Sequence, residues 1–463
     1  MVVAPSAMAV TSQRPQLASA ATPVSAKLGA GHSLLANWSG VNFDYNGAAP
    51  YASADASFYQ QLATLKPGTL RYPGGTGANF FQWKAGLSVN PPAGSCVSST
   101  TSGAFRFRLP DLVKAYRATK APPVYDLNVM TSSLSCQLQL LRRARQLGLP
   151  VRYVELGNEL YLGIKDYPSF FPTAADYGTT VARYVQAIRK DFPHAQVAAV
   201  GSLPTSTARE RDWNTSMLDA ARKAHGLPGA ITLHVYPTDD KALTASGLPG
   251  LFTEPYTELA KISAVIGQLP ASPKVWLTEY NLLPMHTPNG NPAQTSYAQA
   301  LFVAEMNLLL AQHVPSAQFA DLWAAFGGNA SYAYAGHPAD PPQTPGGLAL
   351  QLVDDASHGA TQTRPMNFTG APALTAGGAP GLIGQSFTSA TARREVLINL
   401  TGQVLTIKTG SAIPAGRRYE LVSFSGSPVA QVSQASALTV KHETTGSSIT
   451  VPAYSIILVN PPG

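Results

Sequence analysis

Residues 152–159 read RYVELGNE, a short and largely apolar run that ends at a glycine and two polar residues. A strand that is buried on both faces has this pattern, because neither face needs to be polar. A helix is predicted just downstream, where Thr173 is a suitable N-cap and Asp176 stands three residues on. Apolar residues recur at helical spacing over 177–192, and Pro193 then ends the helix. The sequence therefore predicts a buried strand followed by an amphipathic helix.

Seven further runs resemble this strand and are separated by helical patterns, such as those over 296–313 and 347–356. The runs cover residues 40–43, 68–72, 123–127, 196–200, 231–235, 274–278 and 318–322. Eight strand–helix repeats with right-handed crossovers predict an α/β fold, the (β/α)8 TIM barrel. A doubly wound open sheet is the alternative, and it is disfavoured because no G-x-G-x-x-G motif follows any of these strands.

The pattern changes after about residue 359, where helical periodicity gives way to short alternating segments separated by Gly, Ser and Pro. These segments cover residues 395–400, 404–408, 419–424, 437–441 and 447–460. They predict an all-β sandwich at the C-terminus. We therefore expect a flexible leader over 1–23, a segment over 24–37 that joins the sandwich, the barrel over 38–357 and the sandwich over 358–463.

The composition excludes several classes of protein. Of the 463 residues, 45% are hydrophobic and 12% are charged, which excludes a disordered chain and a coiled coil. No unbroken apolar stretch approaches the length of a membrane span. The net charge is +7, but the basic residues are scattered, so nucleic acid is not an expected partner. A weak attraction to acidic polysaccharide remains open.

The two cysteines, Cys96 and Cys136, are too few and too far apart for a zinc site. They either form a disulfide across 40 residues, which implies an oxidising compartment, or remain unpaired. The first 27 residues lack the basic start and long apolar stretch of a complete signal peptide, and fit a segment that follows one. A secreted or periplasmic location is expected.

Polar and aromatic residues gather where the predicted strands end, and in a TIM barrel that edge carries the active site. The candidate site residues come from five strand ends: Arg71, Asn158, Glu159, His234, Tyr236, Glu279, Tyr280 and Trp323. Two carboxylates, Glu159 and Glu279, are therefore expected at one mouth. Each residue taken alone has a structural explanation, since Arg71 could be an ion-pair partner, and His234 and Trp323 could belong to the core. Glu155 shares the strand face of Glu159 and is the more suitable structural acid.

A pair of carboxyl groups is what hydrolysis of a glycosidic bond requires. One group must be protonated to donate to the leaving oxygen, and the other must be ionised to attack the anomeric carbon. Arg71 and Tyr236 are expected to donate to Glu279 and keep it charged. Asn158 is expected to hold a sugar hydroxyl, and Trp323 to form a flat apolar floor for a sugar ring.

These motifs resemble those of the retaining glycoside hydrolases of clan A, over most of residues 40–357. The resemblance implies that Glu159, after Asn158, is the acid/base and that Glu279 is the nucleophile. The stretches LRYPGG at 70–75 and LHVY at 233–236 are similar to family 51 α-L-arabinofuranosidases. Residues 75–83 and the β domain also resemble family 79 glucuronidases and heparanases, and family 39 shares the architecture. The resemblance implies hydrolysis with retention, with no metal and no organic cofactor.

Two positions depart from the arabinofuranosidase pattern. The predicted nucleophile is followed by Tyr280-Asn281 where Trp-Asn is usual, and Thr76 follows the glycine pair where Asn is usual. No sugar specificity is therefore carried over. The expected substrate is an oligosaccharide or polysaccharide of plant or microbial origin, β-glucuronide or α-L-arabinofuranoside, and the oligomeric state is left open. The alternatives are an inactive carbohydrate-binding barrel and a structural surface protein.

Overall fold

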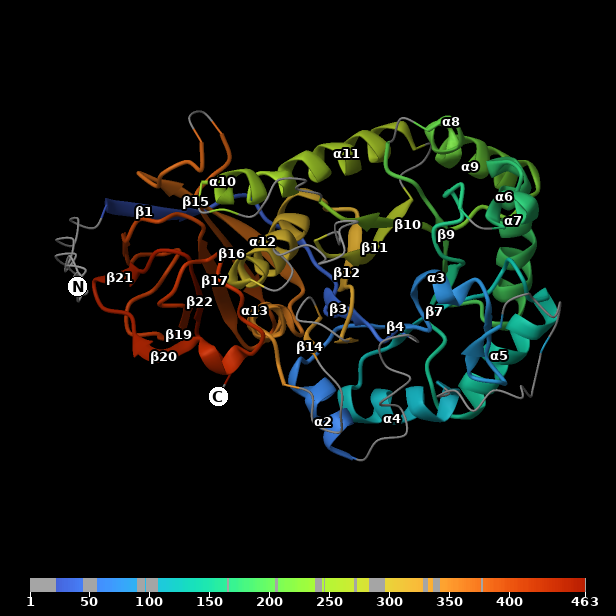
Figure 1. Cartoon of the computed structure of the whole chain (residues 1–463), viewed down its shortest axis with the longest axis horizontal. Coiled ribbons are helices and arrows are strands. Elements are labelled where there is room, and N and C mark those ends of the chain that lie inside the picture. The colour runs from blue at the N-terminus through green and yellow to red at the C-terminus, as the bar shows by residue number, and fades with distance from the viewer. Residues whose placement is uncertain are drawn as a thin grey trace, which may run out of the picture.

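The computed structural model describes residues 22–44, 56–89, 96, 107–164, 166–204, 207–237, 244, 246–269, 273–282, 296–327, 332–335, 342–375 and 378–462. The chain forms a barrel surrounded by helices and a β domain that packs against one side of it (Figure 1). Most of the predicted leader, up to residue 21, lies outside the described residues.

Eight parallel strands close into a barrel, which confirms the predicted fold. In barrel order they are β3 (Ser39–Asn42), β4 (Leu70–Tyr72), β7 (Pro123–Asp126), β8 (Tyr153–Leu156), β9 (Gln196–Val200), β10 (Ala230–Val235), β11 (Lys274–Tyr280) and β12 (Ala317–Leu322). Each strand overlaps one of the eight predicted runs. An apolar cluster that includes Tyr153, Trp276 and Phe319 fills the interior. The polar residues of the site lie further along the strands, toward their C-terminal ends.

Helices cover the outside of the barrel (Figure 1). The longer ones are α2 (Ala56–Thr64), α4 (Leu109–Thr119), α5 (Leu134–Gln146), α7 (Ala174–Asp191), α9 (Trp213–Lys223), α11 (Glu254–Gln268), α12 (Tyr297–His313) and α13 (Pro345–Ser357). Helix α7 begins as predicted, because the Thr173 hydroxyl accepts from the Asp176 N–H and the Asp176 carboxylate accepts from the Thr173 N–H. Short helices occupy the loops: α3 (Gly75–Ala78), α6 (Tyr167–Phe170), α8 (Ala208–Arg211) and α10 (Leu248–Leu251).

The C-terminal domain is the predicted β-sandwich. Its strands are β15 (Gln362–Thr369), β16 (Leu382–Thr388), β17 (Arg393–Asn399), β18 (Leu405–Lys408), β19 (Arg418–Ser423), β20 (Thr439–Thr444), β21 (Ser448–Val451) and β22 (Ser455–Val459). Two N-terminal strands complete it, because β1 (Thr22–Leu28) pairs with β15 and β18, and β2 (His32–Ser33) pairs with β15. The strands run in the order β20-β19-β22-β17-β16-β15-β1-β18-β21.

Several elements were not predicted from the sequence. Strands β15 and β16 were missed, and the single segment expected over 447–460 is two strands, β21 and β22. Two small pairs were also missed, namely β5 (Phe81–Gln82) with β6 (Leu87–Ser88), and β13 (Phe326–Gly327) with β14 (Tyr334–Ala335).

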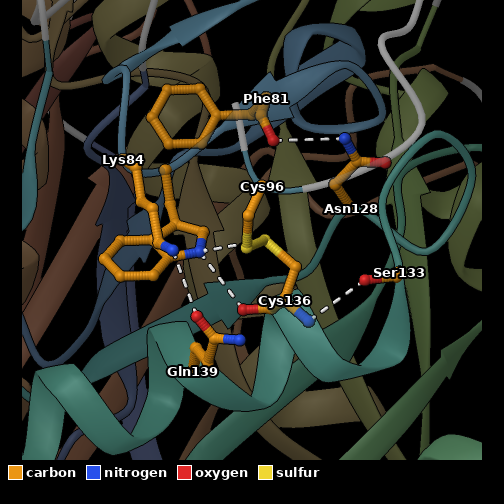
Figure 2. The surroundings of a disulfide bond; sticks show 8 residues. Phe81, Lys84, Cys96, Asn128, Ser133, Cys136 and Gln139 are labelled. Atoms are coloured by element: carbon orange, nitrogen blue, oxygen red, sulfur yellow. Dashed lines mark hydrogen bonds between the residues drawn. A yellow bond between two sulfur atoms is a disulfide. The ribbon is translucent and has the colours of Figure 1, made fainter. Parts of the chain in front are cut away.

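Cys96 and Cys136 form a disulfide, which confirms one of the two alternatives for these residues. The bridge joins the loop beyond β6 to the first turn of α5, as Figure 2 shows. The indole of Trp83 donates to the Cys136 carbonyl at 3.2 Å, and the Cys136 N–H donates to Ser133 Oγ at 3.2 Å. Among the helices of the described residues, none is long and apolar enough to cross a membrane.

Candidate active site

Arg71 is the centre of the site. It is the middle residue of β4, inside the barrel, and its side chain is fully buried. Its three nitrogens make five hydrogen bonds to other side chains. Nε donates to Glu155 at 2.6 Å, and Nη1 donates to Asn42 at 3.0 Å and to Glu279 at 2.5 Å. Nη2 donates to Asp126 at 3.0 Å and to Asn158 at 2.8 Å. A single guanidinium therefore fixes five polar side chains, which come from four strands and their ends.

Glu279 has two strong donors. Its Oε1 accepts from Arg71 Nη1 and its Oε2 accepts from the Tyr236 hydroxyl, each at 2.5 Å. Both contacts agree with the roles predicted for these residues. The β10–β11 register shifts between Leu233 and His234, so that His234 pairs with Glu279 and Thr278 is the extra residue. A bulge of this kind redirects side chains, and it brings both Thr278 and Glu279 to the inner side of the strand.

Glu159 lies opposite Glu279, just after β8. Its backbone φ of 48° is in the left-handed region, which a residue with a side chain occupies only where the surroundings fix it. The Oε1 atom lies 2.9 Å from His234 Nδ1, and the Tyr161 hydroxyl donates to it at 3.4 Å. Glu159 retains 19% of its side-chain exposure, whereas Glu279 retains 5%. The acid nearer the opening is therefore Glu159.

Glu159, His234 and Glu279 form one compact cluster. One ligand atom of each lies within 4.8 Å of the others, so these three residues could hold a metal ion. His234 Nδ1 is also 3.5 Å from Glu279 Oε2, and its Nε2 is 3.2 Å from the Thr278 hydroxyl oxygen. Because Thr278 donates its own proton to Glu155 at 3.1 Å, it can only accept from His234. His234 Nε2 therefore carries a proton.

The surroundings shift the ionisation of this cluster in opposite directions. Burial opposes the ionisation of Glu159, but the hydrogen bond and charge of His234 outweigh it and lower the pKa of Glu159. Burial raises the pKa of Glu279 despite the opposing charges of His234 and Arg71. Burial disfavours the charged form of His234, yet Glu279 and Glu159 raise its pKa. The three groups are thus coupled through His234.

Asn158 is buried, and Trp323 is partly exposed. Asn158 Oδ1 accepts from Arg71, while its Nδ2 is buried with no hydrogen-bond partner among the described residues. Trp323 follows β12, is partly exposed, and packs over Gly74 and Gly75. A Cβ at Gly75, whose φ is 63°, would collide with this ring. The glycine pair therefore gives the indole room to lie flat at the mouth.

Tyr280 is the one predicted binding residue that the structure places elsewhere. Its ring is fully buried, and its hydroxyl accepts from Asn307 Nδ2 of α12 at 3.2 Å. Side chains alternate along a strand, so Tyr280 points outward where Glu279 points inward. It belongs to the packing between the barrel wall and α12.

Sequence reasoning missed three residues that hold the site together. Asn42 ends β3 and Asp126 ends β7, the two strands on either side of β4, and both side chains accept from Arg71. Asn79 clamps the backbone of Asn158: its Oδ1 accepts from the Asn158 N–H at 3.0 Å, and its Nδ2 donates to the Asn158 carbonyl at 2.6 Å. Asn42 and Asp126 could have been found by extending the strand-end argument to β3 and β7, whereas no motif marks Asn79. Glu155 is structural, since Arg71 and Thr278 both donate to it inside the barrel.

Comparison with known proteins shows which solved structures share this fold. No protein-family model matches the sequence, and no curated protein matches it. Among solved structures, a family 51 α-L-arabinofuranosidase from Bifidobacterium longum is similar at 15% identity and a TM-score of 0.72, over 95% of this chain and 99% of that one.

Two further structures show the same likeness. A 4-O-α-L-rhamnosyl-β-D-glucuronidase from Fusarium oxysporum 12S has 14% identity and a TM-score of 0.64, over 95% of this chain and 100% of that one. A family 39 enzyme from Xanthomonas axonopodis pv. citri has 14% identity and a TM-score of 0.57, over 96% and 98% of the two chains. The chain has the barrel-and-sandwich fold of these clan A glycoside hydrolases, as the sequence resemblance predicted.

Proposed function

We propose that the protein is a retaining glycoside hydrolase that uses Glu279 as nucleophile and Glu159 as acid/base. One observation carries the proposal: an oxygen of Glu159, just after β8, and an oxygen of Glu279, in β11, lie within 4.8 Å of each other at the barrel mouth, and the two carboxylates have different hydrogen-bond partners. A separation of about 5 Å suits direct attack by one carboxylate, whereas inverting enzymes need a wider gap that admits a water.

The hydrogen bonds favour Glu279 as the ionised member. Both of its oxygens accept from donors, Arg71 and Tyr236, so a proton on either oxygen would face another donor. Burial acts in the other direction and raises the pKa of Glu279. Glu279 nevertheless suits the nucleophile, because hydrogen bonds between charged groups inside a protein are strong and lose their value if the carboxylate is protonated.

The proton that the leaving group needs is held between Glu159 and His234. Since His234 Nε2 already carries a proton, one further proton lies either on Glu159 or on Nδ1. The lowered pKa of Glu159 corresponds to the state with this proton on His234. Transfer of this proton along the hydrogen bond between His234 Nδ1 and Glu159 Oε1, whose heavy atoms lie 2.9 Å apart, produces the general acid.

The reaction then follows in two steps. A Glu279 oxygen attacks the anomeric carbon, the glycosidic C–O bond breaks with its electron pair going to the leaving oxygen, and Glu159 gives that oxygen a proton. In the second step Glu159 takes a proton from water, the water oxygen attacks the same carbon, and the Glu279 carboxylate is released. Two inversions give net retention of configuration.

Two other residues fit a sugar. The unpartnered Asn158 Nδ2 is a donor available to a sugar hydroxyl close to the scissile bond. Trp323 presents a partly exposed ring, and the apolar face of a sugar stacks on such a ring. Arg71 has no donor left for a uronate carboxylate. The proposed substrates are α-L-arabinofuranosides or β-glucuronides in oligosaccharides or polysaccharides of plant or microbial origin, and a uronate would need a partner other than Arg71.

A secreted or periplasmic location is part of the proposal, and the Cys96–Cys136 bridge supports it because disulfides persist in oxidising compartments. An inactive carbohydrate-binding barrel is the alternative function. A panel of aryl arabinofuranosides, glucuronides, xylosides and galactosides separates the two. We expect turnover of at least one member of the panel, with a product of retained configuration by NMR. Binding of sugars without turnover of any member of the panel would favour the alternative.

A further inference from the structure

Arg209, in α8, makes an unusual set of contacts. Its guanidinium donates to four backbone carbonyls: Nε to Tyr161 at 3.0 Å, Nη1 to Pro172 at 3.0 Å, and Nη2 to Leu160 at 2.9 Å and Phe171 at 2.8 Å. The Leu160 and Tyr161 carbonyls lie at one end of the segment 160–172, and the Phe171 and Pro172 carbonyls lie at its other end. One side chain therefore closes this segment into a loop, which we call the β8 loop.

The β8 loop begins directly after Glu159. Leu160 and Tyr161, whose carbonyls Arg209 holds, are the next two residues in the chain. Glu159 has a φ of 48° and Gly157 a φ of 92°, so the turn that presents Glu159 adopts backbone angles that relax unless neighbours fix them. Tyr161 also donates its hydroxyl to Glu159 Oε1. Movement of these two residues would therefore move the Glu159 carboxyl.

Arg209 is itself fixed to the barrel. Its guanidinium carbon lies 5.1 Å from the centroid of the Trp213 ring, a cation–π distance. Trp213 is fully buried, and its indole N–H donates at 2.8 Å to the carbonyl of Val200, the last residue of β9. Because β9 pairs with β8, the contacts run from the barrel wall through Trp213 and Arg209 to the β8 loop.

We propose that Arg209 is a positioning residue for Glu159: it holds the β8 loop so that the acid/base carboxyl stays within reach of His234 and the leaving oxygen. The proposal rests on the proposed function, because it assigns a role within that reaction. Arg209 itself touches no reacting atom. Its loss should weaken proton donation and leave the Glu279 side of the site, held by Arg71 and Tyr236, in place.

The test compares leaving groups. In Arg209→Ala, kcat for a phenyl glycoside, whose leaving group needs a proton, should fall roughly 10- to 100-fold. With a 2,4-dinitrophenyl glycoside, whose leaving group departs without one, the first step should change less than about threefold. The matched control is Arg189→Ala, because Arg189 also donates to a loop carbonyl, that of Leu227, at 3.0 Å. This control should keep wild-type rates with both substrates.

Chemical rescue gives a second readout. A cavity of about 570 Å³ lined by Arg209, Pro172 and Thr173 opens beside the guanidinium. Guanidinium chloride at millimolar concentration should therefore restore part of the phenyl glycoside activity of Arg209→Ala, while sodium chloride should not. Hydrogen exchange in the intact protein should show faster exchange of the 160–172 amides in Arg209→Ala and not in Arg189→Ala.

Three results would overturn the proposal. Equal losses with both leaving groups, or a loss that Arg189→Ala reproduces, would make Arg209 merely structural. Unchanged exchange of the 160–172 amides would show that Arg209 does not hold the loop. If the wild-type protein turns over no glycoside, the proposed function is refuted, and the catalytic role of Arg209 is refuted with it. The exchange experiment would still decide whether Arg209 holds the β8 loop.

Discussion

Glu159 and Glu279 share one opening but have different partners, and this difference separates their proposed roles. Glu279→Gly should abolish turnover, because no covalent intermediate can form. Glu159→Ala should lower kcat roughly 10²–10⁴-fold for a substrate with a poor leaving group. With a good leaving group, the rate of the first step should fall much less. Added azide should rescue each variant from the side of the missing carboxylate. It should give a glycosyl azide of retained configuration in Glu159→Ala and of inverted configuration in Glu279→Gly.

The configuration of the azide product, measured by NMR, checks this assignment. The reverse stereochemistry in the two variants would mean that the two roles are exchanged. Wild-type rates in both variants would place the active site elsewhere. Glu155→Gln serves as a comparison, since Glu155 is buried beneath the site and bonded to Arg71 and Thr278. Azide should not restore the activity that Glu155→Gln loses, with any substrate.

Asp321 is a second residue whose environment makes a measurable prediction. It is fully buried inside the barrel, with its Oδ1 accepting from the Thr69 hydroxyl and its Oδ2 unpartnered among the described residues. Burial raises the pKa of Asp321 to about 7. A raised pKa in the folded state means that stability is complete below about pH 4, where the unfolded group is also protonated. Stability is then lost as the pH rises from about 4 to about 7, and this group causes no further loss above that range.

Asp321→Asn removes this ionisable group at nearly constant shape. The variant should match the wild type at pH 4 and exceed its unfolding free energy at pH 8 by an amount on the order of 4 kcal/mol. Urea denaturation at both pH values measures the difference. Asp219→Asn, at a side chain that is 56% exposed, is the control for the effect of the Asp-to-Asn change itself. A constant difference between Asp321→Asn and the wild type would contradict the prediction.

At the scale of elements, the barrel strands were predictable because a buried parallel strand is a short apolar run. The sandwich strands were harder. Strand β15 contains Pro365, and β16 is buried yet contains Gln385 and Ser386, so neither shows a clean alternation. The polar residues of β16 lie against its neighbours, as the contact of Gln385 Nε2 with the Thr363 hydroxyl shows. Partners of this kind come from pairing with β15, which a linear pattern does not reveal.

The candidate site was predictable where it depends on strand ends and was not where it depends on a bulge. The extra residue in β11, Thr278, turns Glu279 inward and Tyr280 outward. Nothing in the strand sequence KVWLTEY marks this bulge. The assignment of Tyr280 to substrate binding failed for this reason. Asn79 was missed because it follows a short helix, α3, and reaches Asn158 only once the loops after β4 and β8 meet.

At the scale of the whole molecule, α12 shows how the two domains depend on each other. Its sequence has apolar residues at helical spacing, and every residue from Tyr297 to Ala311 is buried. The sandwich is the reason, since α12 contacts β15, β16, β17 and β22 (Figure 1). The sandwich also supplies partners at the start of the helix. The N–H groups of Tyr297 and Ala298 donate to the carbonyls of Ala430 and Pro428 at 3.2 and 2.9 Å.

These contacts predict that the barrel and the sandwich unfold together. Calorimetry of the intact protein should show one transition, with a calorimetric enthalpy equal to the van't Hoff enthalpy. A chain ending at Ser357 would leave one face of an almost wholly apolar helix in water and two N–H groups without partners, and it should not fold to a monomer. Circular dichroism and size-exclusion chromatography of that chain test the point. Two resolved transitions, or a folded monomeric fragment, would show that the barrel is stable without the sandwich, and that α12 tolerates exposure.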